Sequence, residues 1–282
     1  MMATAACVEG TGDGWLASLQ LRYAEREGRT VLAHRRHQGP LLVQRSFHPE
    51  GAPCHSYLIH PPGGVVGGDR LLLDAELAEG SHAVLTTPAA AKFYRSGGRR
   101  AEQRQTFHVA DGAALEYLPA ETILHGGCDV MLGSRFELSG NARLCTWDVL
   151  CLGRPGSGDH YVGGACVQDL RVLRNGEIRL HERLRLHHGD RFLDATWGLD
   201  RQVVVGTLVA TPAAAGLEGE LRDSLNPPAC VRWGVTRIAD ILLLRCLGPR
   251  AEEVRRLAEQ AWTLLRQPVF DRPPSPPRIW RT

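Results

Sequence analysis

The chain has 282 residues, of which 43% are hydrophobic and 23% charged, and its 33 basic and 31 acidic side chains leave a formal net charge of +2. This composition is typical of a globular protein that can bury a large core. So small a net charge excludes proteins that bind nucleic acid or anionic membranes through bulk positive charge.

The N-terminal residues 1–14 lack the basic stretch and following apolar run of a signal peptide. No apolar run approaches the roughly 20 residues that a membrane helix needs. We therefore predict a cytoplasmic protein with no membrane or nucleic-acid partner, whose eight cysteines are reduced thiols. No Cys-x-x-Cys pair supports a structural zinc site, and Cys54 and His55 are predicted to lie in a polar loop.

Apolar and polar residues alternate along most of the chain, which is the period of a half-buried strand. Strands are predicted at residues 15–23, 30–34, 41–46, 70–77, 83–87, 104–109, 113–118, 130–138, 143–150, 169–173, 177–186 and 201–210. Asp111-Gly112 and Asn175-Gly176 lie between such runs and are typical of hairpin turns. The predicted fold class is therefore mainly β, with antiparallel strands stacked in layers.

Helices are predicted only near the C-terminus, at residues 213–225 and 251–265, with strands between them near 231–236 and 241–246. The second helix has apolar residues at the i, i+3, i+4 spacing of an amphipathic helix. The chain contains no repeat and no linker, so we predict one domain over residues 1–282 with a helical elaboration at about 213–266.

Residues 60–69 read HPPGGVVGGD, with four glycines before an aspartate. A phosphate-binding loop would need Gly-Lys-Ser/Thr followed by a helix, whereas a strand-like run follows here and Asp69 would repel a phosphate. Two interpretations remain open. The glycines allow a tight crossing of backbones, or Asp69 is presented as a polar carboxylate where the backbones leave space.

Four acidic residues lie in β-patterned, weakly polar surroundings: Asp69, Glu121, Asp148 and Glu182. Asp148 interrupts the apolar run 144–152, and a carboxylate there is costly unless it is paired or hydrated. Either an arginine neutralises it, or these residues line a hydrated passage or a weak metal relay. Carboxylate and imidazole ligands bind divalent ions such as nickel less tightly than thiolate-rich sites do, which suits transfer better than storage.

The stretch Lys92-Phe93-Tyr94-Arg95 combines two aromatic residues with two cations. At a surface this composition is typical of a binding hot spot, and inside a fold it is equally compatible with core aromatics flanked by snorkelling bases. Catalytic motifs are missing from the sequence, which contains neither Gly-x-Ser-x-Gly nor His-Glu-x-x-His.

Five motifs together resemble the family of the urease accessory protein UreD, also called UreH. They are TTPAAAKFYRS at 86–96, LPAETIL at 118–124, WDVLCLGRPGSG at 147–158, HERL at 181–184 and PRIWRT at 277–282. They occur in the family's order over nearly the whole chain. His125 stands where the family pattern leads us to expect an aromatic residue, and Asp148 where some relatives carry Glu.

The resemblance implies a β-rich, helix-like stack of strands and a non-catalytic scaffold in urease maturation. Such a scaffold binds urease apoprotein and recruits UreF and, through UreF, the GTPase UreG, so that nickel is delivered to urease, with an internal passage as the proposed route. Nickel would be bound only transiently, with no tightly bound cofactor. Asp69, Asp148 and Glu182 match the polar lining of that passage. His60 and Glu121 are added because they lie near matched motifs, and residues 92–95 are the expected partner-binding stretch.

The alternative hypothesis is a metal-dependent hydrolase that uses the same acidic residues. It predicts that the purified protein hydrolyses an ester or amide when metal is added. It would need a nucleophile or a set of three metal ligands, and the sequence shows neither.

Overall fold

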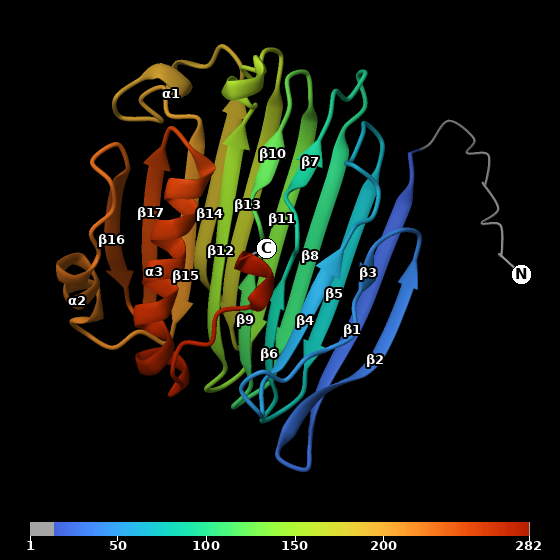
Figure 1. The fold of residues 1–282 in the computed structure, drawn as a ribbon, viewed down its shortest axis with the longest axis vertical. Coiled ribbons are helices and arrows are strands. Elements are labelled where there is room, and N and C mark those ends of the chain that lie inside the picture. Colours follow the sequence, from blue (N-terminus) through green and yellow to red (C-terminus); the bar gives the residue numbers. More distant parts are fainter. Residues whose placement is uncertain (1–13, 282) are drawn as a thin grey trace, which may run out of the picture.

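The structure is a computed structural model that describes residues 14–281 (Figure 1). Residues 1–13, which include Cys7 and nearly all of the stretch on which the signal-peptide prediction rests, lie outside the described residues, as does residue 282. Among the described residues, no helix is both long enough and apolar enough to span a bilayer.

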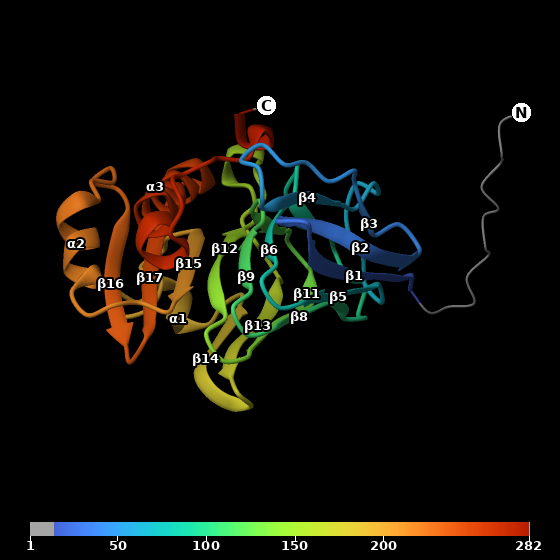
Figure 2. The same ribbon diagram turned by 90° about the horizontal axis from the view of Figure 1, so that it is seen from below.

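The first of two sheets has seven strands in the order β14-β13-β11-β8-β5-β1-β2. Their bounds are β1 Leu16–Arg26, β2 Arg29–Gln38, β5 Arg70–Leu77, β8 Ala101–Val109, β11 Asp129–Leu138, β13 Ala165–Arg174 and β14 Glu177–His187. Figure 2 shows this sheet as the lower of two facing layers.

The second sheet has ten strands, eight of them in the order β16-β17-β15-β12-β9-β6-β4-β3, with β10 and β7 joined through β12. The bounds are β3 Leu42–Val43, β4 Cys54–Ile59, β6 His82–Thr86, β7 Ala91–Phe93, β9 Ala114–Leu118, β10 Thr122–Leu124, β12 Arg143–Leu152, β15 Val204–Thr211, β16 Arg232–Ile238 and β17 Ile241–Gly248. The helices are α1 Arg191–Asp194, α2 Leu217–Ser224 and α3 Ala251–Phe270, with short 3-10 turns at Pro155–Ser157 and Arg278–Arg281.

The mainly β class is confirmed, but the prediction of antiparallel strands is wrong for the centre of both sheets. Strands β1, β5, β8, β11 and β13 pair in parallel, as do β4, β6, β9 and β12. Antiparallel pairing is confined to the ends of the sheets, where it joins β1–β2, β13–β14, β3–β4 and the β12-β15-β17-β16 series. The result is a stack that resembles a β-solenoid.

The wrong prediction of antiparallel pairing has a clear physical cause. Asn175-Gly176 does join the antiparallel neighbours β13 and β14, whereas Asp111-Gly112 joins β8 to β9, which lie in different sheets. A tight turn allows the next strand either to pair edge to edge or to pack face to face across the core. Turn residues mark where the chain reverses, and the two outcomes have the same local sequence signature.

Four elements were not predicted, namely β4, β7, β10 and α1. The prediction that Cys54 and His55 lie in a polar loop is wrong, because both are buried in β4. A strand that is buried on both faces does not alternate between apolar and polar residues, so the pattern that revealed the other strands is absent there.

Helix α3 lies across the outer face of the ten-stranded sheet, over β12, β15 and β17 (Figures 1 and 2). Strand β12 is consequently buried on both sides. Trp147 and Val149 pack in the same cluster as Trp262 of α3, whereas Leu144 packs in the cluster between the sheets. Because side chains alternate along a strand, Asp148 points into the space between the two sheets.

Candidate functional site between the two sheets

Three polar side chains and one leucine form a row on the inner face of the seven-stranded sheet; this row and its counterpart on the ten-stranded sheet are called the polar rows. Gln105 of β8 is the register partner of Ser134 of β11, which pairs with Leu170 of β13, and Leu170 pairs with Glu182 of β14. Register partners on neighbouring strands share one face, so these residues form a line across the sheet.

The ten-stranded sheet carries a facing row. Asp148 of β12 is the register partner of Thr207 of β15, and Thr207 pairs with Arg245 of β17. Polar groups inside a protein are costly unless they meet partners or water. The two facing rows therefore place several polar side chains in an interior whose remaining lining is mostly apolar.

A cavity of about 390 Å³ occupies the first part of this space and is lined by both sheets. Gln105, Ser134 and Asp148 contribute to its wall. Its rim is formed by the loops at 60–64 and 87–91, which include the exposed residues Pro61, Gly63, Pro88 and Ala89. The cavity therefore reaches the surface at these loops.

A second cavity of about 380 Å³ lies farther along the same rows. Thr207, Glu182 and Arg245 line it, together with the exposed side chains of Arg183 and Arg232. It reaches the surface where β14 approaches β17.

Asp148 and Gln168 meet between the two cavities. Asp148 lines the first and Gln168 the second, and the Gln168 amide donates a hydrogen bond to Oδ2 of Asp148 over 2.6 Å. Leu170 lines both cavities. One hydrogen-bonded pair of side chains and one leucine therefore separate two spaces that each open to the surface.

The charge of Asp148 is sensitive to pH near neutrality. Burial raises the pKa of this carboxyl to about 6, although the hydrogen bond from Gln168 opposes the rise. Burial, with a smaller contribution from Asp148, also raises the pKa of Tyr117, which lines the same cavity. A carboxylate has about four acceptor positions, so the bond from Gln168 leaves capacity for a cation.

Glu182 ends the row on the seven-stranded sheet, and His60 lies in the loop 60–64 at the rim of the first cavity. Glu182 accepts two hydrogen bonds from Arg245, at 2.6 and 3.3 Å, across the gap between the sheets. His60 lines the first cavity, and burial lowers its pKa despite the opposing charge of Asp69. A neutral imidazole retains the lone pair that a metal requires.

Asp69 and Glu121 are placed elsewhere, since neither lines either cavity in the described chain. The Asp69 carboxylate accepts the backbone N–H groups of Trp15 and Val66 at 2.8 and 3.0 Å, and Glu121 lies 3.6 Å from Nη1 of Arg255. The structure thus brings Asp148 and His60 to one cavity and Glu182 to the other. A metal role for any of the five stays a prediction.

The glycine run at 63–68 allows a close crossing of backbones. A Cβ atom on Gly67 would lie 1.9 Å from the carbonyl oxygen of Ser96. Asp69 is buried beside this crossing and accepts hydrogen bonds from the Trp15 and Val66 amides. The close crossing of backbones is confirmed, and a site role for the Asp69 carboxylate stays a prediction.

Replacing Asp69 with alanine is expected to lower the free energy of unfolding by about 1–3 kcal/mol, because two N–H groups lose their acceptor. Urea denaturation would measure the loss. Asp74→Ala is the control, since Asp74 is nearly half exposed and lies 3.7 Å from its His108 partner, and it should change stability by less than about 0.5 kcal/mol. Equal stability of the two variants would contradict a structural role for Asp69.

The predicted partner-binding stretch is divided between the interior and the surface. Lys92 lines the first cavity and Phe93 is fully buried, whereas Tyr94 and Arg95 are exposed. The Tyr94 ring stacks on His125 with centroids 4.8 Å apart. Tyr94 and Arg95 therefore present exposed side chains, Lys92 is half-buried and Phe93 is inaccessible. The partner role of all four residues stays a prediction.

Several residues in and around this space were missed by the sequence analysis. Gln168, Thr207 and Arg245 each look like ordinary surface positions in an alternating strand. The strand register places Thr207 and Arg245 in line with Asp148, and a hydrogen bond between the two sheets joins Gln168 to Asp148. Glu116 could have been found, because it interrupts the apolar run 113–118 just as Asp148 interrupts its own. In the structure Glu116 is fully buried and does not line either cavity.

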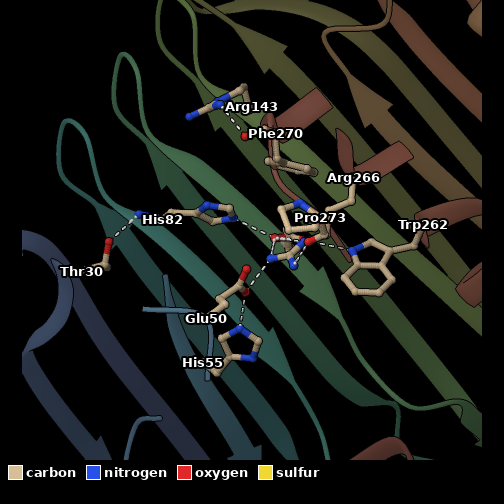
Figure 3. A network of polar contacts seen from close by, with 10 residues as sticks. Thr30, Glu50, His55, His82, Arg143, Trp262, Arg266, Phe270 and Pro273 are labelled. Atoms are coloured by element: carbon tan, nitrogen blue, oxygen red, sulfur yellow. Dashed lines mark hydrogen bonds and ion pairs between the residues drawn. The ribbon is translucent and has the colours of Figure 1, made fainter. Parts of the chain in front are cut away.

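Glu116 is the centre of a separate buried network. Figure 3 labels the other members His82, Trp262, Arg266 and Glu50. It accepts hydrogen bonds from His82 at 2.7 Å, from Trp262 at 2.5 Å and from Arg266 at 3.0 Å. Arg266 also donates to Glu50 at 2.6 Å. Both Glu116 and Arg266 have no exposed side-chain surface, so the network joins α3 to the ten-stranded sheet.

The hydrolase hypothesis requires a nucleophile or a set of three metal ligands in one place, and the second of these can be compared with the structure. Over residues 14–281, no group of three or more His, Cys, Asp or Glu side chains is arranged to hold a metal ion. Asp148 and His60 share a cavity and Glu182 lines the next one, an arrangement that spreads the candidate ligands along a line.

Known proteins share sequence similarity with this chain over nearly its whole length. Residues 16–281 match the family model described as UreD urease accessory protein. The chain is 55% identical over 270 residues to the urease accessory protein UreD of Alkalilimnicola ehrlichii, covering 95% of this chain and 92% of the relative. It is 41% identical over 271 residues to the UreD protein of Klebsiella aerogenes, covering 95% and 97%. Similarity at this level over almost the whole length shows that the chain belongs to the UreD family of urease accessory proteins.

Proposed function

We propose that this chain is a non-catalytic, cytoplasmic scaffold of urease maturation that passes nickel along the polar rows between its sheets. It would hold urease apoprotein and recruit UreF and, through UreF, the GTPase UreG. The membership in a family of urease accessory proteins supports the general role. The observation that carries the route is the position of Asp148 and Gln168 between two cavities that open to different parts of the surface.

Nickel is the cargo of this route and not a resident cofactor. The ion enters the first cavity past His60, reaches Asp148 and continues into the second cavity beside Thr207 and Glu182. Oxygen ligands and a single imidazole hold a nickel-like ion only moderately compared with thiolates, and the ligands are spaced out along the rows. Each position therefore binds the ion weakly enough to release it to the next.

Gln168 is the movable part of this route. Its amide donates a hydrogen bond to Asp148, and a cation on Asp148 would replace that donor. The Glu182–Arg245 pair at the far end is about 35% and 45% exposed. Exposed ion pairs contribute only about 0–1 kcal/mol, so Glu182 can release Arg245 at low cost when a cation or a docked protein arrives.

A steric block tests the route without altering any charged group. Ser134→Leu adds bulk to the wall of the first cavity, and the matched control Ser139→Leu makes the same change at an exposed turn. Each variant is co-expressed with urease apoprotein, UreF and UreG, and the purified complex is assayed for composition and for nickel per urease active site.

We expect both variants to co-purify with the partners and Ser134→Leu alone to load on the order of tenfold less nickel, which corresponds to about 1.4 kcal/mol in the passage of the ion. Normal loading by Ser134→Leu would overturn the internal route. Failure of the unmodified chain to co-purify with urease apoprotein would overturn the scaffold role itself.

A further inference from the structure

Strand β2 ends the seven-stranded sheet and leaves one backbone edge open. Among the described residues it pairs only with β1. Thr30, near its start, is covered, since its N–H donates to Ala52 and its carbonyl lies 2.8 Å from Nε2 of His48. Residues 33–38 are all exposed, and Figure 1 shows β2 at the end of the sheet.

The open part of β2 reads AHRRHQ and carries two arginines and two histidines without an acidic residue. The β1 register partners of Arg35 and Arg36 are Leu21 and Gln20, neither of which is acidic. Over residues 14–281, neither guanidinium takes part in an ion pair or hydrogen bond. The positive charge of this edge is therefore not neutralised within the described chain.

The positive charges lie on both faces of the strand. Arg35 and His37 are register partners of the buried residues Leu21 and Leu19, so they are on the inner face of the sheet. Both side chains are nevertheless exposed. Arg36 lies on the outer face beside Gln20.

We propose that residues 33–38 of β2 receive an extended acidic segment of a partner protein, which adds to the sheet as one further strand. Free backbone N–H and C=O groups on an edge strand are the element that β-strand addition uses, and carboxylates on the added strand would meet the unpaired arginines. A second copy of this chain is disfavoured, because antiparallel pairing of two β2 edges would place like charges opposite each other. A nucleic acid could meet the charges but has no peptide groups to pair with the strand edge.

Basic residues on an edge strand can also serve only to prevent edge-to-edge aggregation. The two roles predict different results with an acidic peptide. Protection alone requires no binding, whereas the proposed docking requires binding that depends both on charge and on the backbone of the peptide. This inference does not rest on the nickel route, and either can fail alone.

The probe is a fluorescent eight-residue peptide of four glutamates and four threonines, and its match is a peptide of the same charge with two threonines replaced by proline. Proline removes a backbone donor and disrupts strand pairing. Fluorescence anisotropy measures binding to the full chain, and hydrogen exchange of residues 33–38 reports whether the edge is covered.

We expect the Glu-Thr peptide to bind and to slow exchange at residues 33–38. Arg35→Glu with Arg36→Glu should weaken binding at least tenfold, and the neutral pair Arg35→Gln with Arg36→Gln should weaken it less while keeping the fold. Arg185→Glu with Arg191→Glu makes the same charge change at exposed positions of β14 and α1 and should leave binding unchanged.

Equal binding of the proline peptide would show charge attraction without strand addition and would overturn the proposal. No detectable binding, no effect of either β2 variant, or equal binding of a single-stranded oligonucleotide of the same net charge would overturn it as well.

Discussion

Replacing Arg266 with methionine is expected to lower the free energy of unfolding by about 3–5 kcal/mol, the usual effect of removing one partner from a buried ion pair. The guanidinium has no exposed surface and lies 3.0 Å from Glu116 and 2.6 Å from Glu50. It also donates to the Pro273 carbonyl at 2.8 Å. Methionine fills a similar space. The loss of unfolding free energy therefore reports the cost of leaving Glu50 and Glu116 without their shared cation.

Chemical denaturation provides the measurement, and Arg256→Met provides the control. Arg256 lies on the same helix and pairs with Glu252 at 2.6 Å, but both side chains are mostly exposed. Such i, i+4 pairs contribute about 0.3–0.5 kcal/mol. A second variant, Arg266→Met with Glu116→Gln, also removes the unpaired buried charge of Glu116 and should recover part of the lost stability. If Arg266→Met and Arg256→Met proved equally stable, the network would not hold α3 in place.

The same network predicts a loss of stability in acid. Burial would raise the pKa of Glu50, but hydrogen bonds from His55 and Arg266 outweigh it and lower the pKa to about 2. The pKa of Glu116 is also lowered, because His82 and Arg266 outweigh its burial. A lowered pKa stabilises the fold above the unfolded value, near 4.3, and this stability is lost as pH falls toward 2. The wild type should therefore lose stability over this range more steeply than Arg266→Met does.

Replacing Asp148 with asparagine is expected to reduce nickel-dependent urease activation on the order of tenfold, or about 1.4 kcal/mol of lost cation interaction. Asparagine keeps the shape of the side chain and can still bond to Gln168, but it carries no charge. Activation of co-expressed urease apoprotein and nickel per active site are the readouts. Glu137→Gln, which neutralises a partly exposed carboxylate paired with Arg135, should activate urease normally.

The pH dependence separates a charge effect from a folding effect. Because the pKa of Asp148 is about 6, wild-type activation should fall as pH drops through 6, whereas the low activity of Asp148→Asn should not change there. A raised carboxyl pKa contributes stability below the unfolded value of about 3.9, and that contribution is lost as pH rises through 6. Asp148→Asn should thus be at least as stable as the wild type at pH 7.5. Full activation by this variant would remove Asp148 from the route.

Much of the architecture could be predicted from local patterns. Alternating residues placed most strands within a few positions, and Asn175-Gly176 marked a true hairpin between β13 and β14. The i, i+3, i+4 spacing identified α3, although the helix continues past the predicted end at 265 to Phe270. These features depend on residues close together in the sequence, and they can therefore be predicted from it.

The candidate site shows where such patterns stop being informative. Asp148 and Glu116 each interrupt an apolar run, and nothing local distinguishes them. In the structure Glu116 meets Arg266, 150 residues away, whereas Asp148 meets Gln168 between two cavities. Glu116 is thus part of a buried, paired network, whereas the Asp148 carboxylate keeps acceptor positions that no protein donor within residues 14–281 uses.

Local sequence was enough to establish the mainly β class, the positions of the turns, the amphipathic C-terminal helix and, through five ordered motifs, the family. The three-dimensional arrangement was needed to show that the central strands are parallel and that β2 has an open basic edge. It was also needed to show that Gln168 bonds to Asp148 and Arg245 to Glu182 across the gap between the sheets. The first group of features could be predicted because hydrophobic periodicity and turn residues act within a few positions of the sequence. Strand register and the partner of a buried charge depend on segments that the fold alone brings together.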